Sequence, residues 1–331
     1  MTDDLAPDPH PVDEPLDFLG DRLRRDESLA PLSTYRVGGA AARFVEVADP
    51  AELARIAGAL VGVLAPEQLL VVGRGSNLLV ADRGFDGLAL QLGERFAEVR
   101  IDEGEAADEE VDGTRVRAGG AAALPVVARR TVAAGLTGFE WAVGVPGSIG
   151  GAVRMNAGGH GADMAEVLVG VHVVDLCSGE DVHVSTAALD LGYRRSALRP
   201  SQVVTRADLA LRPGDRSEGE SRLSEIVRWR REHQPGGANA GSVFTNPDGD
   251  SSGRLIDAAG CKGLRVGGAE VSPKHANFIQ SDPDGSASDV VEVMRRVVER
   301  VEATAGVRLH AETVLVGFDD DVLRDLTGGP R

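Results

Sequence analysis

Two glycine-rich segments have the composition of loops that bind phosphate groups. The longer one, residues 135–161, holds nine of the 42 glycines. Glycine at that density does not suit the interior of a helix or strand, because it loses the most backbone freedom on ordering. The run V-P-G-S-I-G-G at residues 145–151 predicts bare backbone N–H groups, which together form a nest for an anion. A glycine-rich turn in a β region is an equally good interpretation of this segment alone.

The shorter segment is Gly73-Arg74-Gly75-Ser76-Asn77, which follows the apolar, strand-like run 69–72. A strand that ends in such a turn can hold a phosphate, although a plain hairpin turn is the commoner meaning of the pattern. The third glycine and the following helix of a Rossmann dinucleotide fingerprint are missing. Two loops about 70 residues apart suit the two phosphates of one dinucleotide.

Three polar side chains stand at breaks or edges of the pattern: Arg194 in G-Y-R-R-S, Ser242 on a glycine turn, and Glu312 in the last predicted strand. Each also has an ordinary interpretation as a surface arginine, a turn cap or a solvated edge carboxylate. Lys262 and Lys274 are the only lysines in an arginine-rich chain. A lysine is a compact point charge that arginine does not replace.

The composition limits the class of protein. The chain has 331 residues, 42% hydrophobic and 26% charged, which is ordinary for a globular protein of two or three domains. A net charge of −17 argues against nonspecific binding of nucleic acid. Two cysteines, no secretory signal and no apolar run of membrane-spanning length predict a cytoplasmic protein without disulfides. We predict no metal site and a monomer.

Alternating and 3.6-residue patterns predict the elements that position these residues. Residues 1–26 are acidic and proline-rich, which predicts a disordered tail with one helical turn near 16–23. A boundary between domains is expected at Pro213-Gly214-Asp215. The predicted helices are 50–64, 124–134, 223–232, 253–260 and 287–307. An acidic loop is expected at 104–112. The main predicted strands are 69–72, 88–92, 98–101, 114–119, 167–174, 181–184, 203–211, 266–271, 277–279 and 310–316.

Five motifs in order carry a specific resemblance. They are G-R-G-S-N-L-L-V, G-F-E-W-A-V-G-V-P-G-S-I-G-G-A-V-R-M-N-A-G, G-Y-R-R-S, N-A-G-S-V-F-T-N-P and G-R-L-I-D-A-A-G-C-K-G-L-R-V-G-G-A-E-V-S-P-K-H-A-N-F-I. Over residues 31–317 the chain resembles the UDP-N-acetylenolpyruvoylglucosamine reductase family. The resemblance implies an α+β fold: an FAD-binding module of the PCMH or vanillyl-alcohol-oxidase type, made of two α/β subdomains, plus a smaller C-terminal α/β substrate domain. The expected bounds are 27–214 for the module, split near 95, and 215–318 for the substrate domain, with a tail at 319–331.

The resemblance also implies a reaction. NADPH, as co-substrate, reduces non-covalently bound FAD, and the flavin then passes hydride to UDP-N-acetylglucosamine enolpyruvate to give UDP-N-acetylmuramate for peptidoglycan. A C=C bond conjugated only to a carboxylate is a poor hydride acceptor, so the site must supply positive charge or a proton at that carboxylate. The family's catalytic trio falls on Arg194 as the carboxylate clamp, Ser242 as the proton donor, and Glu312 as a partner of Arg194, plausibly a neutral acid with a raised pKa.

The family's binding residues carry over by motif position. FAD contacts are expected from Tyr35, Arg36, Gly73, Arg74, Gly75, Ser76, Asn77, Leu78, Gly119, Pro146, Gly147, Ser148, Ile149, Gly150, Gly151, Asn156 and Arg230. Substrate contacts are expected from Tyr193, His233, Asn246 and Lys262, while Lys274 and His275 are as readily structural.

Two departures and three alternatives remain open. His233 stands where many relatives have lysine, and the stretch between Arg194 and Ser242 contains no tyrosine, so the chain resembles the subtype without a tyrosine lid loop. A flavin oxidase of the same superfamily is the competing interpretation; such enzymes often tether flavin through a histidine or cysteine, and the central loop contains His160. A nucleotide-sugar binding protein without chemistry and a nicotinamide-only dehydrogenase are further alternatives, the second disfavoured by the missing Rossmann fingerprint.

Overall fold

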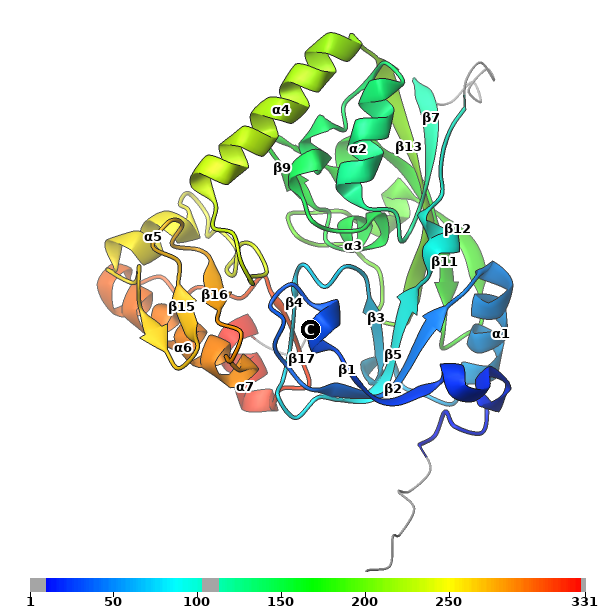
Figure 1. Ribbon diagram of the computed structural model, residues 1–331, viewed down its shortest axis with the longest axis horizontal. Helices are drawn as coiled ribbons and strands as arrows, with labels where there is room; N and C mark the ends of the chain where they lie inside the picture. Colours follow the sequence, from blue (N-terminus) through cyan, green and yellow to red (C-terminus); the bar gives the residue numbers. More distant parts are fainter. Residues whose placement is uncertain (1–9, 103–112, 329–331) are drawn as a thin grey trace, which may run out of the picture.

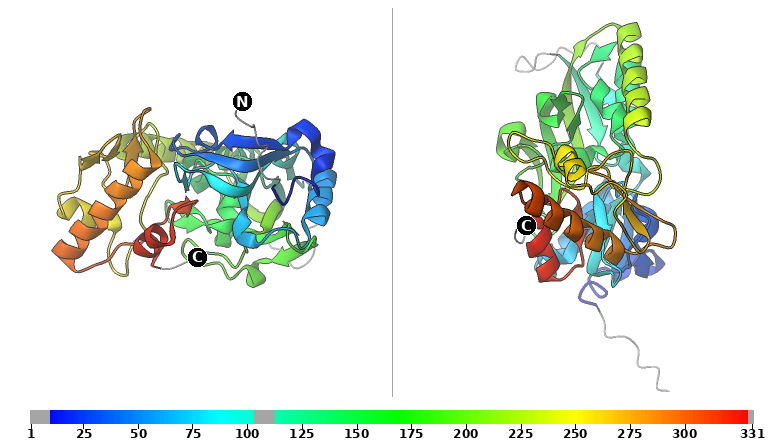
Figure 2. Two further views of the ribbon diagram at one scale, coloured as in Figure 1. Left: turned by 90° about the horizontal axis from the view of Figure 1, so that it is seen from below. Right: turned by 90° about the vertical axis from the view of Figure 1, so that its left-hand side faces the viewer.

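Three packed bodies make up the protein. The computed structural model describes residues 10–102 and 113–328, so the predicted acidic loop 104–112 lies outside the described residues. Two sheet-based subdomains lie next to each other, and a smaller helical and sheet body stands to one side of both (Figures 1 and 2). Within the described ranges, no helix combines the length and the apolar character needed to cross a membrane.

The first subdomain is a four-stranded sheet in the order β1-β2-β5-β3 (Figure 1). It consists of β1 Arg24–Ser28, β2 Ala40–Val47, β3 Leu69–Val72 and β5 Phe85–Leu92, with 3-10 turns at Ala30–Leu32 and Pro66–Gln68. Strands β2 and β3 both run parallel to β5, and helix α1 (Pro50–Leu60) connects them as the predicted β-α-β unit. The helix ends four residues earlier than predicted, at Leu60, because Gly62 takes a left-handed φ of 73°.

The expectation of a disordered tail over residues 1–26 is wrong from His10 onward. Val12 and Leu16 are completely buried against the face of α1, and Asp13 forms an ion pair with Arg43. A 3-10 segment at Asp17–Arg22 and then β1 continue the ordered chain. The prediction rested on the acidic composition and overlooked three apolar residues, at 12, 16 and 19. Their spacing places them on one face of this segment.

The second subdomain is an antiparallel sheet in the order β12-β11-β13-β7-β6. Its strands are β6 Val99–Ile101, β7 Thr114–Gly119, β11 Leu168–Asp175, β12 Asp181–Ser185 and β13 Gln202–Pro213. Helices α2 (Leu124–Ala133) and α3 (Ile149–Arg154) share one apolar core with the inward side chains of this sheet. Smaller pieces complete it: β8 Leu136–Thr137, β9 Gly158–Gly159, β10 Ala162–Asp163, and 3-10 turns at Glu94–Ala97, Glu140–Gly144, Met164–Glu166 and Thr186–Leu189.

The position of helix α4, Arg216–His233, shows where one packed body ends relative to the boundary predicted at Gly214. The helix begins directly after that boundary, with the Asp215 side chain accepting from the N–H of Glu218. Its buried residues Leu223 and Ile226 nevertheless pack in the core of the second subdomain, alongside α2. The apolar core therefore changes after His233, where the chain crosses to the third body.

The third body is built around helix α6, Ala287–Ala305, whose apolar stripe is buried as predicted. It packs on a small sheet of β14 Arg265–Val266, β15 Ala269–Val271 and β16 Ile279–Ser281, and on α5 Ser252–Ala258. The expected tail 319–331 is wrong over its first part, because α7 (Asp320–Thr327) packs on α6 with Leu326 fully buried.

Strand pairing and a helix cap help to fasten the third body to the first subdomain. Strand β17 (Val314–Val316) leaves the third body and pairs in parallel with β4 (Leu78–Val80). In addition, the Asp82 carboxylate, just beyond β4, accepts from the N–H groups of Ala287 and Ser288 at 2.8 and 2.9 Å. A carboxylate at a helix N-terminus satisfies free N–H groups and complements the helix dipole, so Asp82 caps α6 from another subdomain.

We expect Asp82→Ala to lower the free energy of unfolding by about 1 kcal/mol, because two helix N–H groups lose their acceptor. Chemical denaturation measures this change. Asp284→Ala is the matched control, since Asp284 is an exposed aspartate in the loop before the same helix. Equal stability of the two variants would show that Asp82 does not hold α6.

Candidate functional site

The glycine loops predicted to cooperate lie against one another. The N–H and the hydroxyl of Thr34 both donate to the Gly75 carbonyl, at 3.1 and 3.2 Å. Gly75 has a φ of 59°, and a Cβ there would lie 2.0 Å from the Leu32 carbonyl oxygen. A Cβ on Gly73 would lie 2.8 Å from Ser148 Oγ in the other loop. Loops 32–36, 73–77 and 146–151 therefore meet where only glycine fits.

One of the two loops keeps its N–H groups free for an anion. Within the described parts of the chain, the backbone N–H groups of Arg74, Gly75, Ser76 and Asn77 have no hydrogen-bond partner. These groups suit a phosphate. The nest predicted at Gly147, Gly150 and Gly151 is wrong for the last two, because their N–H groups donate to the Gly120 carbonyl and to Ser148 Oγ. A Cβ on Gly150 would lie 3.2 Å from the Gly120 carbonyl oxygen, so this glycine allows α3 to pack closely.

A cavity of about 160 Å³ opens between the two subdomains at this junction. Of the residues predicted to contact FAD, it is lined by Gly73, Arg74, Ser148, Gly150 and Gly151. Gly120, Arg154 and Gln202 also line it, and the sequence analysis missed them. Arg154 is held by the carbonyls of Leu198, Arg199 and Gln202, and burial lowers the pKa of its guanidinium.

Other predicted FAD residues lie beneath the loops and not on the cavity. The Tyr35 ring is fully buried in the core of the third body, which raises the pKa of its hydroxyl. Ile149 is also fully buried, and a Cβ on Gly119 would lie 2.0 Å from the Phe96 carbonyl oxygen. These residues shape the loops, and the direct contact of Tyr35 and Ile149 with a ligand stays a prediction.

The three predicted catalytic residues come together from three distant segments. Arg194 Nε lies 2.7 Å from Glu312 Oε1, and both side chains are mostly buried. The Glu312 N–H donates to the carbonyl of Val243, next to Ser242, at 2.7 Å. The Asn77 amide donates to the Glu312 carbonyl at 3.1 Å. The trio therefore stands beside the loop with the free N–H groups.

Arg194 is presented at the tip of a tight hairpin. Gly192 and Arg195 exchange two backbone hydrogen bonds of 3.0 and 3.1 Å, which forces Arg194 to a φ of 55°. An arginine in that left-handed region is strained, which is typical of functional sites. The buried Asn156 fixes the hairpin by donating to the Gly192 carbonyl at 3.1 Å. Its position supports a role in placing Arg194.

Arg195 points elsewhere, which separates it from its neighbour. Its guanidinium lies 3.3 Å from Asp190, and 66% of its side chain is exposed, against 24% for Arg194. Tyr193, predicted to contact substrate, is 59% exposed with its ring under the Arg194 guanidinium. The structure thus places Arg194 and Tyr193 together and turns Arg195 to the surface.

Ser242 lines a second, polar cavity of about 370 Å³ in the third body. Gly241 before it has a φ of 75°, and the buried Asn277 holds the following residues through hydrogen bonds to Val243 and Phe244. The predicted substrate residues Asn246 and Lys262 line the same cavity. Arg254 and Lys274 add positive charge, Asp257 and His275 also line the cavity, and the excess of cationic side chains suits an anionic ligand.

His233 and Arg230 lie near the end of α4. His233 does not line the second cavity; its ring stacks on Trp229 at 4.6 Å between centroids. Arg230 packs against Gly144 in the central glycine-rich segment, and burial lowers its pKa. Within the described ranges no carboxylate pairs with Arg230, so its charge is available to a ligand.

Comparison with known proteins gives concordant matches. Residues 41–185 match a family model described as an FAD binding domain, and residues 233–316 match one described as the C-terminal domain of UDP-N-acetylenolpyruvoylglucosamine reductase. Proteins of the latter name from Symbiobacterium thermophilum and Paramagnetospirillum magneticum are 42% and 40% identical, over 90% and 91% of this chain and 93% and 94% of their own. The crystal structure of such a reductase from Thermus caldophilus superposes with a TM-score of 0.73 at 35% identity, covering 89% of this chain and 99% of that one.

We expect Gly75→Ala to lower the free energy of unfolding by about 2 kcal/mol or more, because a left-handed alanine is strained and its Cβ meets the Leu32 carbonyl. The flavin content per purified chain should fall with it. Gly58→Ala is the control: it lies in α1 with open space around it and should gain about 0.5–1 kcal/mol. An unchanged Gly75→Ala protein would contradict the loop junction.

Proposed function

The chain belongs to the UDP-N-acetylenolpyruvoylglucosamine reductase family, and from this membership we propose that it reduces UDP-N-acetylglucosamine enolpyruvate to UDP-N-acetylmuramate, a peptidoglycan precursor, with FAD as cofactor and NADPH as reductant. The observation that carries the proposal is the Arg194–Glu312 pair beside Ser242. The Glu312 backbone contacts Asn77, in the loop whose Gly73 and Arg74 line the first cavity, and Val243, next to Ser242 in the second cavity.

The residues present fit FAD. The free N–H groups of Arg74 to Asn77 would hold a phosphate, and Ser148 and Gly150 would line the cavity that receives the rest of one half of the cofactor. Arg230 and the central glycine-rich segment would lie toward the reactive end. Bound FAD, once reduced by NADPH, would supply the hydride that the β-carbon of the enolpyruvyl group receives.

The second cavity would bind the nucleotide sugar. Its two lysines and Arg254 bring positive charge to a site lined by Asn246 and Ser242. Lys262 is held 2.7 Å from Asp257, which fixes the ammonium at the cavity wall. A diphosphate is the part of the substrate that would use this charge, and the enolpyruvyl group would then reach toward Ser242 and Arg194.

Arg194 would activate the substrate through its carboxylate. Hydride addition at the β-carbon builds negative charge on that carboxylate, and a guanidinium placed there in advance stabilises the charge without reorganising. Without substrate, the Glu312 carboxylate forms an ion pair with the Arg194 guanidinium. A substrate carboxylate on the same guanidinium would place two anions side by side, which favours a proton on Glu312. Glu312 would then donate a hydrogen bond to the developing enolate.

Ser242 would complete the reduction with a proton. After the hydride has reached the β-carbon, the α-carbon carries the electron pair of the former double bond, and the Ser242 hydroxyl would protonate it. A hydroxyl is a weak acid, so the step depends on the strong basicity of the enolate and on fixed alignment. The turn at Gly241 and the hydrogen bonds of Asn277 provide that alignment. Water would return the proton to the serine.

A product assay tests the proposal as a whole. Purified protein with FAD, NADPH and UDP-N-acetylglucosamine enolpyruvate should consume the two substrates in equal amounts and form UDP-N-acetylmuramate, identified by mass. Consumption of NADPH without that product would contradict the assignment.

Arg194→Lys should lower kcat on the order of 10²–10³-fold, because an ammonium cannot make the paired contacts of a guanidinium to a carboxylate. Arg195→Lys is the matched control and should stay within about twofold of the wild type, since an exposed ion pair contributes little. Steady-state rates of both variants show which of the two arginines acts on the substrate. A larger loss in the Arg195 variant would reverse the assignment of the two arginines.

Ser242→Ala should lower kcat for the sugar on the order of 10²–10⁴-fold, the usual contribution of a positioned acid. Reduction of the flavin by NADPH, followed by stopped-flow absorbance, should keep its rate, because that step needs no proton from Ser242. Equal losses in both half-reactions would mean that Ser242 only supports the structure of the turn.

A further inference from the structure

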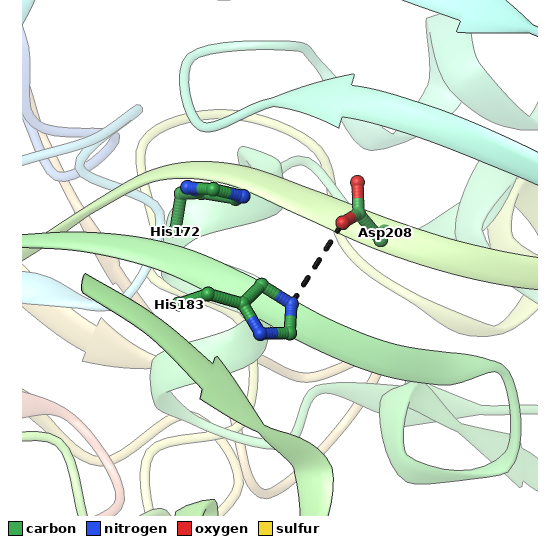
Figure 3. Close-up of side chains that lie close together, drawn as sticks. All are labelled: His172, His183 and Asp208. Atoms are coloured by element: carbon green, nitrogen blue, oxygen red, sulfur yellow. Dashed lines mark ion pairs between the residues drawn. The ribbon is translucent and has the colours of Figure 1, made fainter.

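Three potential metal ligands meet on the sheet of the second subdomain, away from the site described above. His172 on β11, His183 on β12 and Asp208 on β13 place one ligand atom each within 4.8 Å of the others (Figure 3). In residues 10–102 and 113–328, no other group of three histidine, cysteine or acidic side chains does so.

The strand register puts these residues on the outer face of the sheet. His172 stands directly opposite His183 on one side and Arg206 on the other, and Asp208 stands opposite Gly170. The alternate residues Val171, Val173 and Ala207 belong to the core shared with α2 and α3. The cluster is therefore separated by the sheet from the loop 146–151 that leads into α3.

Gly170 makes room for one of the rings. A Cβ at this position would lie 2.6 Å from His183 Nε2 and 2.7 Å from Cε1, so the imidazole lies over the glycine. Glycine inside a strand weakens it and commonly marks the close approach of another group. Here the missing side chain lets His183 reach across β11 toward Asp208 on the third strand.

The Asp208 carboxylate is arranged as a ligand with a supporting contact. It is 6% exposed; Oδ1 accepts from Arg206 Nε at 3.2 Å, while Oδ2 faces His183 Nε2 at 3.9 Å. That gap is too wide for a hydrogen bond. Two ligands of one zinc ion, each about 2.0–2.2 Å from it, stand only slightly closer together than this. Arg206 thus orients the carboxylate and leaves the oxygen facing the histidines.

We propose that His172, His183 and Asp208 bind a divalent transition-metal cation of the zinc class, with a fourth position for water. Two imidazoles and one carboxylate are a donor set that zinc accepts.

The proposed ion would fasten the edge of the sheet. Strand β12 lies at one edge of the sheet, and four of its five residues are exposed: Asp181, Val182, His183 and Ser185. A cation bound by one residue from each of β12, β11 and β13 would tie this edge to two inner strands. Binding only to the folded state would also raise the stability of the protein by mass action.

Titration of the FAD-loaded, chelator-treated protein with zinc chloride, followed by calorimetry, tests the site. We expect one ion per chain. His172→Gln and His183→Gln should each weaken binding by at least the 10–100-fold typical of losing a supporting partner of a ligand. His310→Gln, which changes an exposed histidine outside the cluster, should bind like the wild type. Absence of binding, or equal binding by all variants, would overturn the proposal.

Gly170→Ala is a second test that removes no ligand. Its Cβ would displace the His183 ring, so zinc affinity should fall while circular dichroism and flavin content stay unchanged. Cobalt as a probe should give the visible bands of a four-coordinate ion in the wild type and lose them in this variant. Full zinc affinity in Gly170→Ala would show that the ion, if any, binds elsewhere.

Discussion

The pairing of β17 with β4 is the constraint on which the site depends. In this pairing Val314 stands opposite Leu78. Two residues that closely precede them, Glu312 and Asn77, are hydrogen-bonded although 235 positions separate them in the chain. Because the last strand returns to the first subdomain, Glu312 stands next to the loop with free N–H groups, and its own N–H reaches Val243 beside Ser242. One ladder therefore brings the proposed FAD site and the proposed proton donor to the same place, and Asp82 reinforces it from the N-terminus of α6.

Arg194 completes the site from the second subdomain, at a local energetic cost. Its left-handed backbone persists because the hairpin 192–195 is closed by two hydrogen bonds and held by Asn156. Glycine has a matching role in the first subdomain, where Gly75 allows the loop 73–77 to touch the Leu32 carbonyl. Constrained backbone on both sides holds the Arg194 guanidinium and the Glu312 carboxylate in place. Preorganised charge of this kind is what stabilises a developing anion.

Much of this arrangement could be predicted from sequence where the signal is local or lies in a motif. Periodicity found α1, α2 and α6. The motifs selected Arg194 and Glu312, which form an ion pair, and Ser242, whose neighbour Val243 accepts from the Glu312 N–H. Periodicity could not predict the segments whose position depends on burial against distant parts of the chain. Residues 12–19 are ordered by contact with α1, and α4 packs on the second subdomain although a turn precedes it. Two features depend on tertiary partners and on strand register, which no single segment records. One is that the N–H groups at 74–77 are free whereas those of Gly150 and Gly151 are not, and the other is the cluster of His172, His183 and Asp208.

The central claim is that one site carries hydride from NADPH to an enolpyruvyl nucleotide sugar. The most direct measurement is the absorbance spectrum of the flavin-loaded protein, followed without oxygen through one equivalent of NADPH and then one of UDP-N-acetylglucosamine enolpyruvate. The account predicts that the yellow colour bleaches with NADPH and returns when the sugar is added. A flavin that bleaches but regains its colour only when oxygen is admitted would contradict the claim and identify an oxidase.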